Sequence, residues 1–464
     1  MLILDNDSLL NIFYLCRPIL LDEEEVDESR ILQGGEWVRE RWWYKLVQVC
    51  RRWRYLILAS PNRLGLCLVC TYGTPVADML AHAPPLPLIL DYVDGGREVT
   101  TEDEEGILLA LHRRDRLRRI RLGLPASNLR TLLVAIDEAF PMLEYLYIEP
   151  LTKDDEDVKI PATFQAPDLR YLSLRNISFP IGSPLLTTTA GLATLSLDDI
   201  PLSAYFHPGD LLRRLSLMPQ LETLGILFNF PVPNRDIRRQ LSETPVTTHI
   251  TLPNLRWFGF KGASAYLEAL LPHITTPVLE KLQIMFYNQL TFFIPHLPQF
   301  MSTVGNFRFK SARFMFNDWG FSAKMYPREW AGAYALYMEV ICGHLEWQVA
   351  SAAQIFETLG TMFSAVEYLT VESWRDFTSL EWSNEADRTQ WHELLRPFSN
   401  VKTLHVDDGL VKELSRALQI DDGESPMGLL PELKAISSGD FGETFTPFIN
   451  ARQNAGHPVI LVRR

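Results

Sequence analysis

A short motif of the form L-x-x-L-x-L recurs through most of this 464-residue chain. Its copies and close variants start at Leu117, Leu143, Leu169, Leu192, Leu221, Leu255, Leu279, Val304, Val366, Val401 and Leu433. Each copy ends in an alternation of apolar and other residues, which is the pattern of a strand with one buried face. The sequence therefore predicts one strand for each copy.

The spacing of the copies indicates how these strands are connected. Most copies start 23 to 35 residues after the previous one, which is enough for a strand and a return segment. The interval from Val304 to Val366 is 62 residues, so we expect a further strand inside it. Leu336, Met338 and Val340 alternate as a strand would and are our candidate.

Several return segments have helical spacing. Residues 102–112, 128–140 and 264–271 carry apolar residues three and four positions apart. Strands that alternate with helices at this period are typical of a leucine-rich-repeat solenoid, in which parallel strands lie side by side and each unit buries its apolar positions against its neighbours. We therefore expect an α/β solenoid over residues 64–464.

Two details refine this expectation. The asparagine that usually follows the last strand leucine is mostly missing, and only Asn229 fits, so we expect an irregular solenoid. Residues 445–455 have the pattern of a last helix and residues 458–462 that of a short strand. These two elements are expected to form the C-terminal cap.

The first 63 residues have helical spacing with a charged interruption. The acidic run DEEEVDES lies in an insert at residues 17–36, which we expect to be a solvated loop. After the insert, an apolar stripe predicts a single helix that ends before Pro61. The stripe consists of Trp43, Leu46, Val49, Cys50, Trp53 and Leu56. Residues 1–63 are therefore predicted to form an all-helical module.

Two stretches of this module carry a family resemblance. The segments LDNDSLLNIF, from Leu4, and VCRRWRYL, from Val49, resemble the F-box, a three-helix module that binds the small adaptor of cullin-type ubiquitin ligases. The whole chain is similar to mushroom-type fungal F-box proteins, in which a degenerate leucine-rich-repeat domain follows the box. Two features depart from the family pattern: Asp5 stands where a proline is usual, and the insert lengthens the link after the first helix.

The resemblance implies a function without catalysis. The chain would be the substrate-recognition (SCF) subunit of a cullin-type ubiquitin ligase, with the box binding the adaptor and the solenoid binding an unknown target protein. The residues expected to bind the adaptor are Leu4, Leu9, Ile12, Phe13, Leu46, Val49, Cys50, Trp53 and Leu56. The alternative is a stand-alone leucine-rich-repeat interaction scaffold whose box has decayed, which Asp5 and the insert favour.

Strand alternation predicts where a target would bind. Residues between the motif leucines should line the concave face of the solenoid, where arginine and tyrosine are typical of interface hot spots. The predicted target-binding residues are Arg119, Arg121, Tyr145, Tyr147, Tyr171, Arg175 and Trp257. Together they predict a basic and aromatic patch for an acidic or phosphorylated segment. The alternatives are that loops cover these rings, or that a loop at residues 151–161 binds the target.

Composition narrows the kinds of ligand, the location and the cofactors that the chain could have. The chain has 44 Lys and Arg against 57 Asp and Glu, a net charge of −13, which argues against nucleic-acid binding. No apolar run is long enough for a membrane span. Five cysteines are too few for a disulfide framework in so long a chain, which favours the cytoplasm or the nucleus. Because Cys67 and Cys70 have no second ligand pair, we expect core thiols, with no metal or other cofactor.

Overall fold

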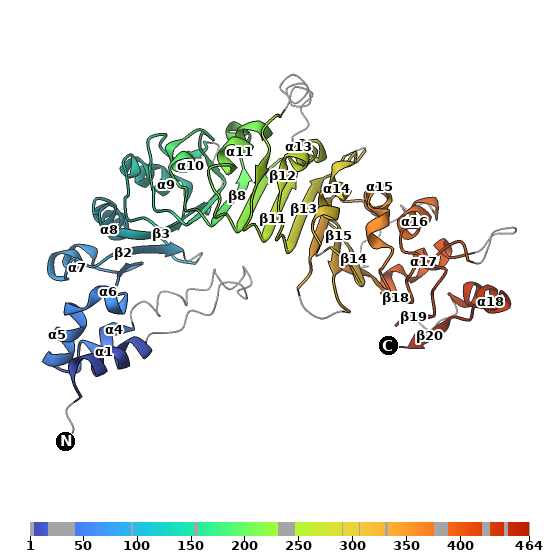
Figure 1. The fold of residues 1–464 in the computed structure, drawn as a ribbon, viewed down its shortest axis with the longest axis horizontal. Helices are drawn as coiled ribbons and strands as arrows, with labels where there is room; N and C mark the ends of the chain where they lie inside the picture. The colour runs from blue at the N-terminus through green and yellow to red at the C-terminus, as the bar shows by residue number, and fades with distance from the viewer. Residues whose placement is uncertain are drawn as a thin grey trace. The chain divides into compact units, whose positions relative to one another are not determined.

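The computed structural model describes residues 4–16, 42–93, 96–152, 156–230, 246–289, 291–305, 307–329, 333–374, 388–419, 427–439 and 444–463. The chain forms two compact units, residues 1–206 and residues 207–464, which we describe one by one (Figure 1). The acidic insert at residues 17–36 lies outside the described residues. The domain boundary expected at residue 63 stays a prediction.

The described residues before the sheet form the helices α1 (Asn6–Leu15), α4 (Trp43–Leu46), α5 (Arg51–Ala59) and α6 (Pro61–Leu64). Asp5 caps α1, since its carboxylate accepts a hydrogen bond from the Ser8 amide at 2.8 Å. The side chains of Leu9, Leu10, Phe13, Trp43, Leu56 and Ile57 are buried in this helical module.

The single helix expected from Trp43 to Leu56 is wrong. Cys50 has an extended backbone, with φ −157° and ψ 168°, and it separates α4 from α5. Its Sγ accepts a hydrogen bond from the Trp53 amide at 3.5 Å, so Cys50 is the N-cap of α5. An uninterrupted apolar stripe did not reveal this break, because a cap changes the backbone without changing the hydrophobic pattern.

The rest of the first unit is a parallel sheet. Its strands, in spatial order, are β1 (Leu68–Cys70), β2 (Leu88–Val93), β3 (Leu117–Leu124), β4 (Tyr145–Pro150), β6 (Tyr171–Arg175) and β8 (Thr194–Ile200). The α-helices that the structure describes between them are α7 (Val76–His82), α8 (Thr101–Leu111), α9 (Ala126–Leu133) and α10 (Pro184–Thr187). Strands β5 (Val158–Lys159) and β7 (Ile177–Ser178) form a separate small pair.

The register of this sheet explains the repeated leucines. Leu146 of β4 lies beside Leu172 of β6, which lies beside Leu195 of β8, and each is at most 1% exposed. Burying one such side chain contributes about 1.5 to 3 kcal/mol. The helices α8, α9 and α10 lie on one side of the sheet (Figure 1). We call the other side, which carries the residues between the leucines, the open face.

In the described part of the second unit, ten strands pair in one sheet. Their spatial order is β9 (Thr223–Phe228), β11 (Trp257–Gly262), β13 (Lys281–Tyr287), β16 (Leu336–Ile341), β15 (Gly320–Tyr326), β14 (Ser311–Asn317), β17 (Tyr368–Trp374), β18 (Thr403–Val406), β19 (Ala435–Ser438) and β20 (Ile460–Arg463). The two-residue strands β10 (Ile250–Thr251) and β12 (Ile274–Thr275) pair separately.

Helices again form the return segments of this unit. They are α11 (Pro208–Leu215), α13 (Ser264–Leu270), α14 (His296–Thr303), α15 (Leu345–Thr358), α16 (Arg388–Leu395), α17 (Val411–Ala417) and α18 (Thr446–Asn454). The predicted C-terminal helix and strand are confirmed as α18 and β20. With its parallel strands and helical returns, the unit has a leucine-rich-repeat-like architecture.

One hairpin interrupts the parallel order. β15 runs antiparallel to β14 on one side and to β16 on the other. The strand expected at Leu336 is confirmed as β16, but the strand expected at Val304 is wrong, because the paired segment begins only at Ser311. Phe307 and Phe309 are buried, so the motif at this place indicates burial rather than strand pairing.

Candidate binding surfaces

The helical module divides the predicted adaptor-binding residues by exposure. Leu4, Ile12 and Val49 are 48%, 41% and 60% exposed, and Cys50 is also exposed. Leu9, Phe13 and Leu56 are buried, while Leu46 and Trp53 are half-buried. The exposed residues are therefore available to a partner, and the buried ones form the interior on which the module depends.

Ion pairs and hydrogen bonds hold α1 against the later helices. Arg52 donates to the Leu4 carbonyl at 2.6 Å and to Asn6 Oδ1 at 2.9 Å. Arg63 donates to Asp7 Oδ1 at 3.1 Å and to Asn11 Oδ1 at 2.7 Å. The Leu4 backbone is therefore fixed beside the first turn of α5, which begins right after the exposed Val49 and Cys50.

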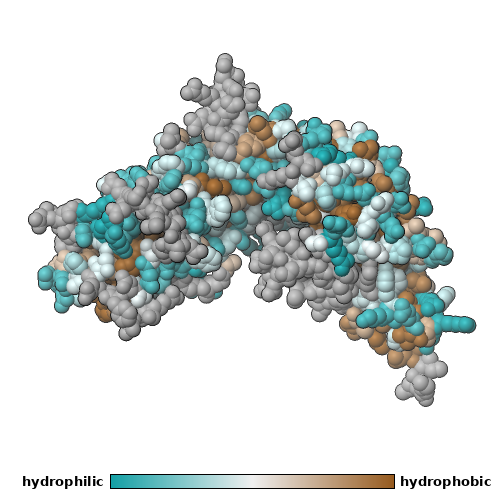
Figure 2. Space-filling view, turned by 180° about the vertical axis from the view of Figure 1, so that it is seen from behind, coloured by the Kyte–Doolittle hydropathy of each residue, from teal (hydrophilic) through white to brown (hydrophobic). Residues whose placement is uncertain are grey.

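Further exposed apolar side chains lie on the same helices and were missed from the sequence. Leu15 is 80% exposed and Tyr55 is 74% exposed. Tyr55 lines a shallow depression along α5 together with Arg51, Arg54 and Leu58. Apolar residues gather on the surface of the helical module, at the lower right of Figure 2. Helical spacing alone does not tell which apolar residues face a neighbouring helix. The sequence therefore predicted the helical module but not which of its apolar residues are exposed.

The open face of the first unit brings the predicted tyrosines together. The register places Arg119, Tyr145 and Tyr171 side by side on β3, β4 and β6. The rings of Tyr145 and Tyr171 stack, with centroids 4.1 Å apart and an interplanar angle of 4°. Arg121 and Tyr147 form the next row. The predicted neighbours are thus adjacent, and whether they bind a target stays a prediction.

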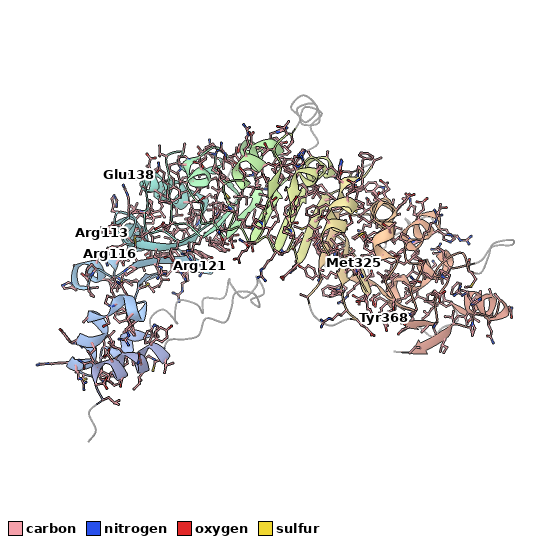
Figure 3. The ribbon with its side chains drawn as sticks, in the orientation of Figure 1. Arg113, Arg116, Arg121, Glu138, Met325 and Tyr368 are labelled. Carbon is pink, nitrogen blue, oxygen red and sulfur yellow. The ribbon has the colours of Figure 1, made fainter. Side chains whose placement is uncertain are left out.

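The predicted basic character of this patch is wrong. Arg121 forms an ion pair with Asp91 at 3.0 Å, and the two side chains are 9% and 7% exposed. Figure 3 labels Arg121 on this face. Arg175 lies 3.1 Å from Glu149 and 3.3 Å from Asp199. These arginines are neutralised by carboxylates of adjacent strands, so they offer little net charge to an anionic ligand.

Tyr147 belongs to the same network. Its hydroxyl donates to Glu149, which also accepts from Arg175. Burial, reinforced by this hydrogen bond, raises the pKa of Tyr147, so the phenol stays protonated and remains a donor. The patch is therefore a network of stacked tyrosine rings, hydrogen bonds and ion pairs.

Arginines of the run at residues 112–121 also form hydrogen bonds and ion pairs within the chain. Arg116 donates to the Leu86 carbonyl at 2.9 Å, and Arg118 lies 2.8 Å from Glu144. Arg114 pairs with Glu138. Figure 3 labels Arg113, Arg116 and Glu138 at this end of the sheet. Several arginines of this run therefore connect neighbouring repeats to one another.

Trp257, the remaining predicted target-binding residue, lies in the second unit. Its ring covers Gly259, two residues along β11, where an added Cβ would lie 2.2 Å from the indole. Gly259 therefore has to be glycine for the ring to take this position. Trp257 is half-buried, so part of the ring remains exposed.

The second unit carries a cationic and aromatic group that the sequence did not reveal. The Lys281 Nζ lies 4.1 Å from the centre of the Tyr334 ring, and the Lys324 Nζ lies 5.7 Å from the same ring and 5.9 Å from that of Tyr337. Lys324 belongs to the unexpected hairpin. The alternation from Ser311 to Tyr326 around a turn could have indicated that hairpin.

The described residues can be compared with the requirements of a metal site and of a membrane span. Among them, no group of three or more His, Cys, Asp or Glu side chains could hold a metal ion. Cys67, just before β1, and Cys70, at the end of β1, are buried, as expected of core thiols. No helix in the described part of the chain is long and apolar enough to span a membrane. In the loop at residues 151–161, residues 153–155 lie outside the described residues.

No protein-family model and no curated protein matches this chain. Among solved structures it is similar to the leucine-rich repeat-containing protein LegL7 from Legionella pneumophila, with 12% identity, a TM-score of 0.24, and coverage of 84% of this chain and 98% of LegL7. It is also similar to the TLR13 chain of a TLR13–ssRNA13 complex, with 12% identity and a TM-score of 0.28 over 85% of this chain and 52% of that one. This chain thus spans about half of that TLR13 chain. Because both TM-scores are below 0.5, the architecture described above rests on strand order and register alone.

Proposed function

We propose that this chain is the substrate-recognition subunit of a cullin-type ubiquitin ligase. The N-terminal helical module binds the ligase adaptor, and the repeats bind a target protein. The observation that carries the proposal is the set of exposed apolar side chains on a module that already has a core of its own. Leu4, Ile12, Leu15, Val49 and Tyr55 are each more than 40% exposed.

Such a surface is typical of a docking site. Several large apolar side chains exposed on one small module are unfavourable in water unless a partner covers them, and aromatic anchors such as Tyr55 are common in interface hot spots. Arg52 of α5 donates to the Leu4 carbonyl and so fixes the Leu4 backbone beside α5, which would give a partner a preformed site. The F-box resemblance of these segments supports an adaptor as that partner.

Catalysis by the chain itself is not part of the proposal. By holding a target close to a ligase-bound ubiquitin carrier, the chain raises the effective concentration of the target lysines. Its own residues supply two binding surfaces and the rigid spacing within each unit. We therefore expect ubiquitin transfer to require both surfaces on one chain.

A pull-down with purified adaptor tests the proposal. The double variant Ile12→Glu/Val49→Glu places charge on exposed positions, so the fold should persist while adaptor capture is lost. The control Leu109→Glu/Val134→Glu makes the same change at apolar residues that are 44% and 73% exposed outside the module. Equal capture by the module variant and the control would contradict the proposed surface.

The alternative is a stand-alone interaction scaffold with a decayed box. It draws support from Asp5 and from the insert at residues 17–36. Asp5, however, caps α1 through the Ser8 amide, so this departure from proline does not disrupt the helix. If the wild-type chain captures no adaptor, the scaffold function is the better account.

A further inference from the structure

The hairpin of the second unit creates a positively charged surface within an acidic chain. On the open face of β11, β13, β16, β15, β14 and β17, the described charged side chains are four cations and two carboxylates. They are Lys261, Lys281, Arg313, Lys324, Glu339 and Glu372. The whole chain has a net charge of −13, so this local excess of cations has the opposite sign.

Both carboxylates already have partners. Arg313 lies 2.6 Å from Glu372, and the Tyr337 hydroxyl donates to Glu339 at 2.7 Å. Lys281 and Lys324 form no ion pair with any carboxylate in the described part of the chain. Their charges are therefore available to a ligand, in contrast to those of Arg121 and Arg175 in the first unit.

Aromatic rings hold these two ammonium groups in place. Tyr334 lies 4.1 Å from the Lys281 Nζ and 5.7 Å from the Lys324 Nζ. The ring of Tyr337, which lies 5.8 Å from that of Tyr334, is 5.9 Å from the Lys324 Nζ. A ring face attracts a cation without neutralising it, so both lysines are positioned while they keep their charge.

Strand register sets the size of this surface. Gln283, Tyr337, Lys324 and Arg313 occupy one row across β13, β16, β15 and β14. Three strand spacings of about 4.8 Å give a width of about 14 Å. An extended peptide advances about 3.4 Å per residue, so about four residues cross the row.

We infer that this hairpin face, defined by Lys281, Arg313, Lys324, Tyr334 and Tyr337, is the target-binding surface and takes a short anionic peptide segment. The identification of that segment as part of a ligase target rests on the proposed function. Carboxylate and phosphate groups share the chemistry that ammonium groups bind. A short segment suits the site better than a long polyanion, because the rest of this acidic chain repels a polyanion beyond the local patch.

Fluorescence anisotropy of the full chain tests the inference with fluorescein-labelled probes. The probes are hexaglutamate, a hexapeptide with alternating phosphoserine and glycine, hexalysine, and hexauridylate. We expect one or both anionic peptides to bind, with the tighter one identifying carboxylate or phosphate as the preferred group. Any binding of hexalysine to the acidic remainder of the chain should be the same in the wild-type chain and in Lys281→Gln/Lys324→Gln. Preference for hexauridylate over both anionic peptides would overturn the inference in favour of a nucleic-acid site.

The variant Lys281→Gln/Lys324→Gln should weaken peptide binding about tenfold or more, since it removes both available charges from the face. The control Lys159→Gln/Lys434→Gln changes the net charge equally at exposed lysines elsewhere and should stay within about twofold of wild type. Tyr334→Leu keeps both charges and should still weaken binding, because the lysines lose their common ring. Equal loss in the control, or no peptide binding by the wild-type chain, would overturn the inference.

Adaptor capture separates this inference from the proposed function. The Lys281→Gln/Lys324→Gln variant should capture adaptor as the wild-type chain does, because it leaves the helical module unchanged. Absent peptide binding with adaptor capture intact would overturn the hairpin face alone. Peptide binding without any adaptor capture would overturn the ligase function and leave an anionic-peptide-binding scaffold.

Discussion

Arg121 and Asp91 form a buried ion pair, with the Arg121 Nη1 3.0 Å from the Asp91 Oδ2 and both side chains less than a tenth exposed. The pair joins β2 to β3 on the open face of the first unit. Arg121, which the sequence predicts to bind a target, therefore connects two strands of the sheet. Its positive charge is balanced by a residue 30 positions earlier in the chain.

Breaking this pair should destabilise the first unit strongly. Asp91→Ala leaves the Arg121 charge buried without its partner, which we expect to lower the free energy of unfolding by about 3 kcal/mol. Replacing both residues, in Asp91→Leu/Arg121→Met, should recover much of that loss because no isolated charge remains. Urea unfolding followed by circular dichroism compares the variants. A double variant as unstable as the single one would contradict this account.

The cap at Asp5 should make the start of α1 sensitive to pH. Hydrogen bonds from Ser8 lower the pKa of Asp5, so the folded state favours the ionised carboxylate. The resulting stabilisation is present above the ordinary carboxyl pKa and is lost as the pH falls through the lowered value. The Ser8 amide chemical shift should follow this titration. In Asp5→Asn the amide should keep a cap but lose the acid transition.

The core of the helical module should depend more on Phe13 than on Trp53. Their rings contact edge to face with centroids 4.8 Å apart, but Phe13 is 1% exposed and Trp53 is half-buried. Phe13→Ala should therefore destabilise the module by about 3 to 5 kcal/mol, and Trp53→Ala by less. Thermal unfolding monitored by tryptophan fluorescence in the Phe13 variant, and by circular dichroism in both, checks the order. A larger effect for Trp53 would refute this packing.

The C-terminal repeat should depend on Arg452. This side chain is 0% exposed, and its Nη2 donates to the carbonyls of Leu430, Pro431 and Leu433 at 3.2, 2.9 and 3.3 Å. Arg452→Met removes this donor, while the Leu430 carbonyl still accepts from the Leu433 amide, and should lower stability by about 3 kcal/mol. The control Arg256→Met removes an exposed arginine paired with Glu280 and should change stability by about 1 kcal/mol or less. Urea unfolding midpoints distinguish the two.

The strands were largely predictable because their signal is local. The leucines of each L-x-x-L-x-L copy report burial on one face, and ten of the eleven copies coincide with strands. The exception, at Val304, shows the limit of the pattern. Phe307 and Phe309 are buried without being paired, since a loop can bury the same side chains that a strand would.

The charge state of the open faces was not predictable in the same way. Asp91 lies on β2, which carries no copy of the motif, so its position opposite Arg121 depends on a strand that the repeat did not identify. Likewise, Lys324 meets Tyr337 only because the hairpin inserts β15 beside β16. Ion pairing depends on register between distant segments, whereas burial depends on each segment by itself.

Hydrogen exchange of the full chain with and without purified adaptor tests the central claim most directly. If the helical module binds the adaptor, amides in α1 (Asn6–Leu15) and α5 (Arg51–Ala59) should exchange more slowly in the complex, while those of β3, β4 and β6 should not change. The same experiment on Ile12→Glu/Val49→Glu should show no protection. Unchanged exchange in α1 and α5 of the wild-type chain at saturating adaptor would contradict the claim.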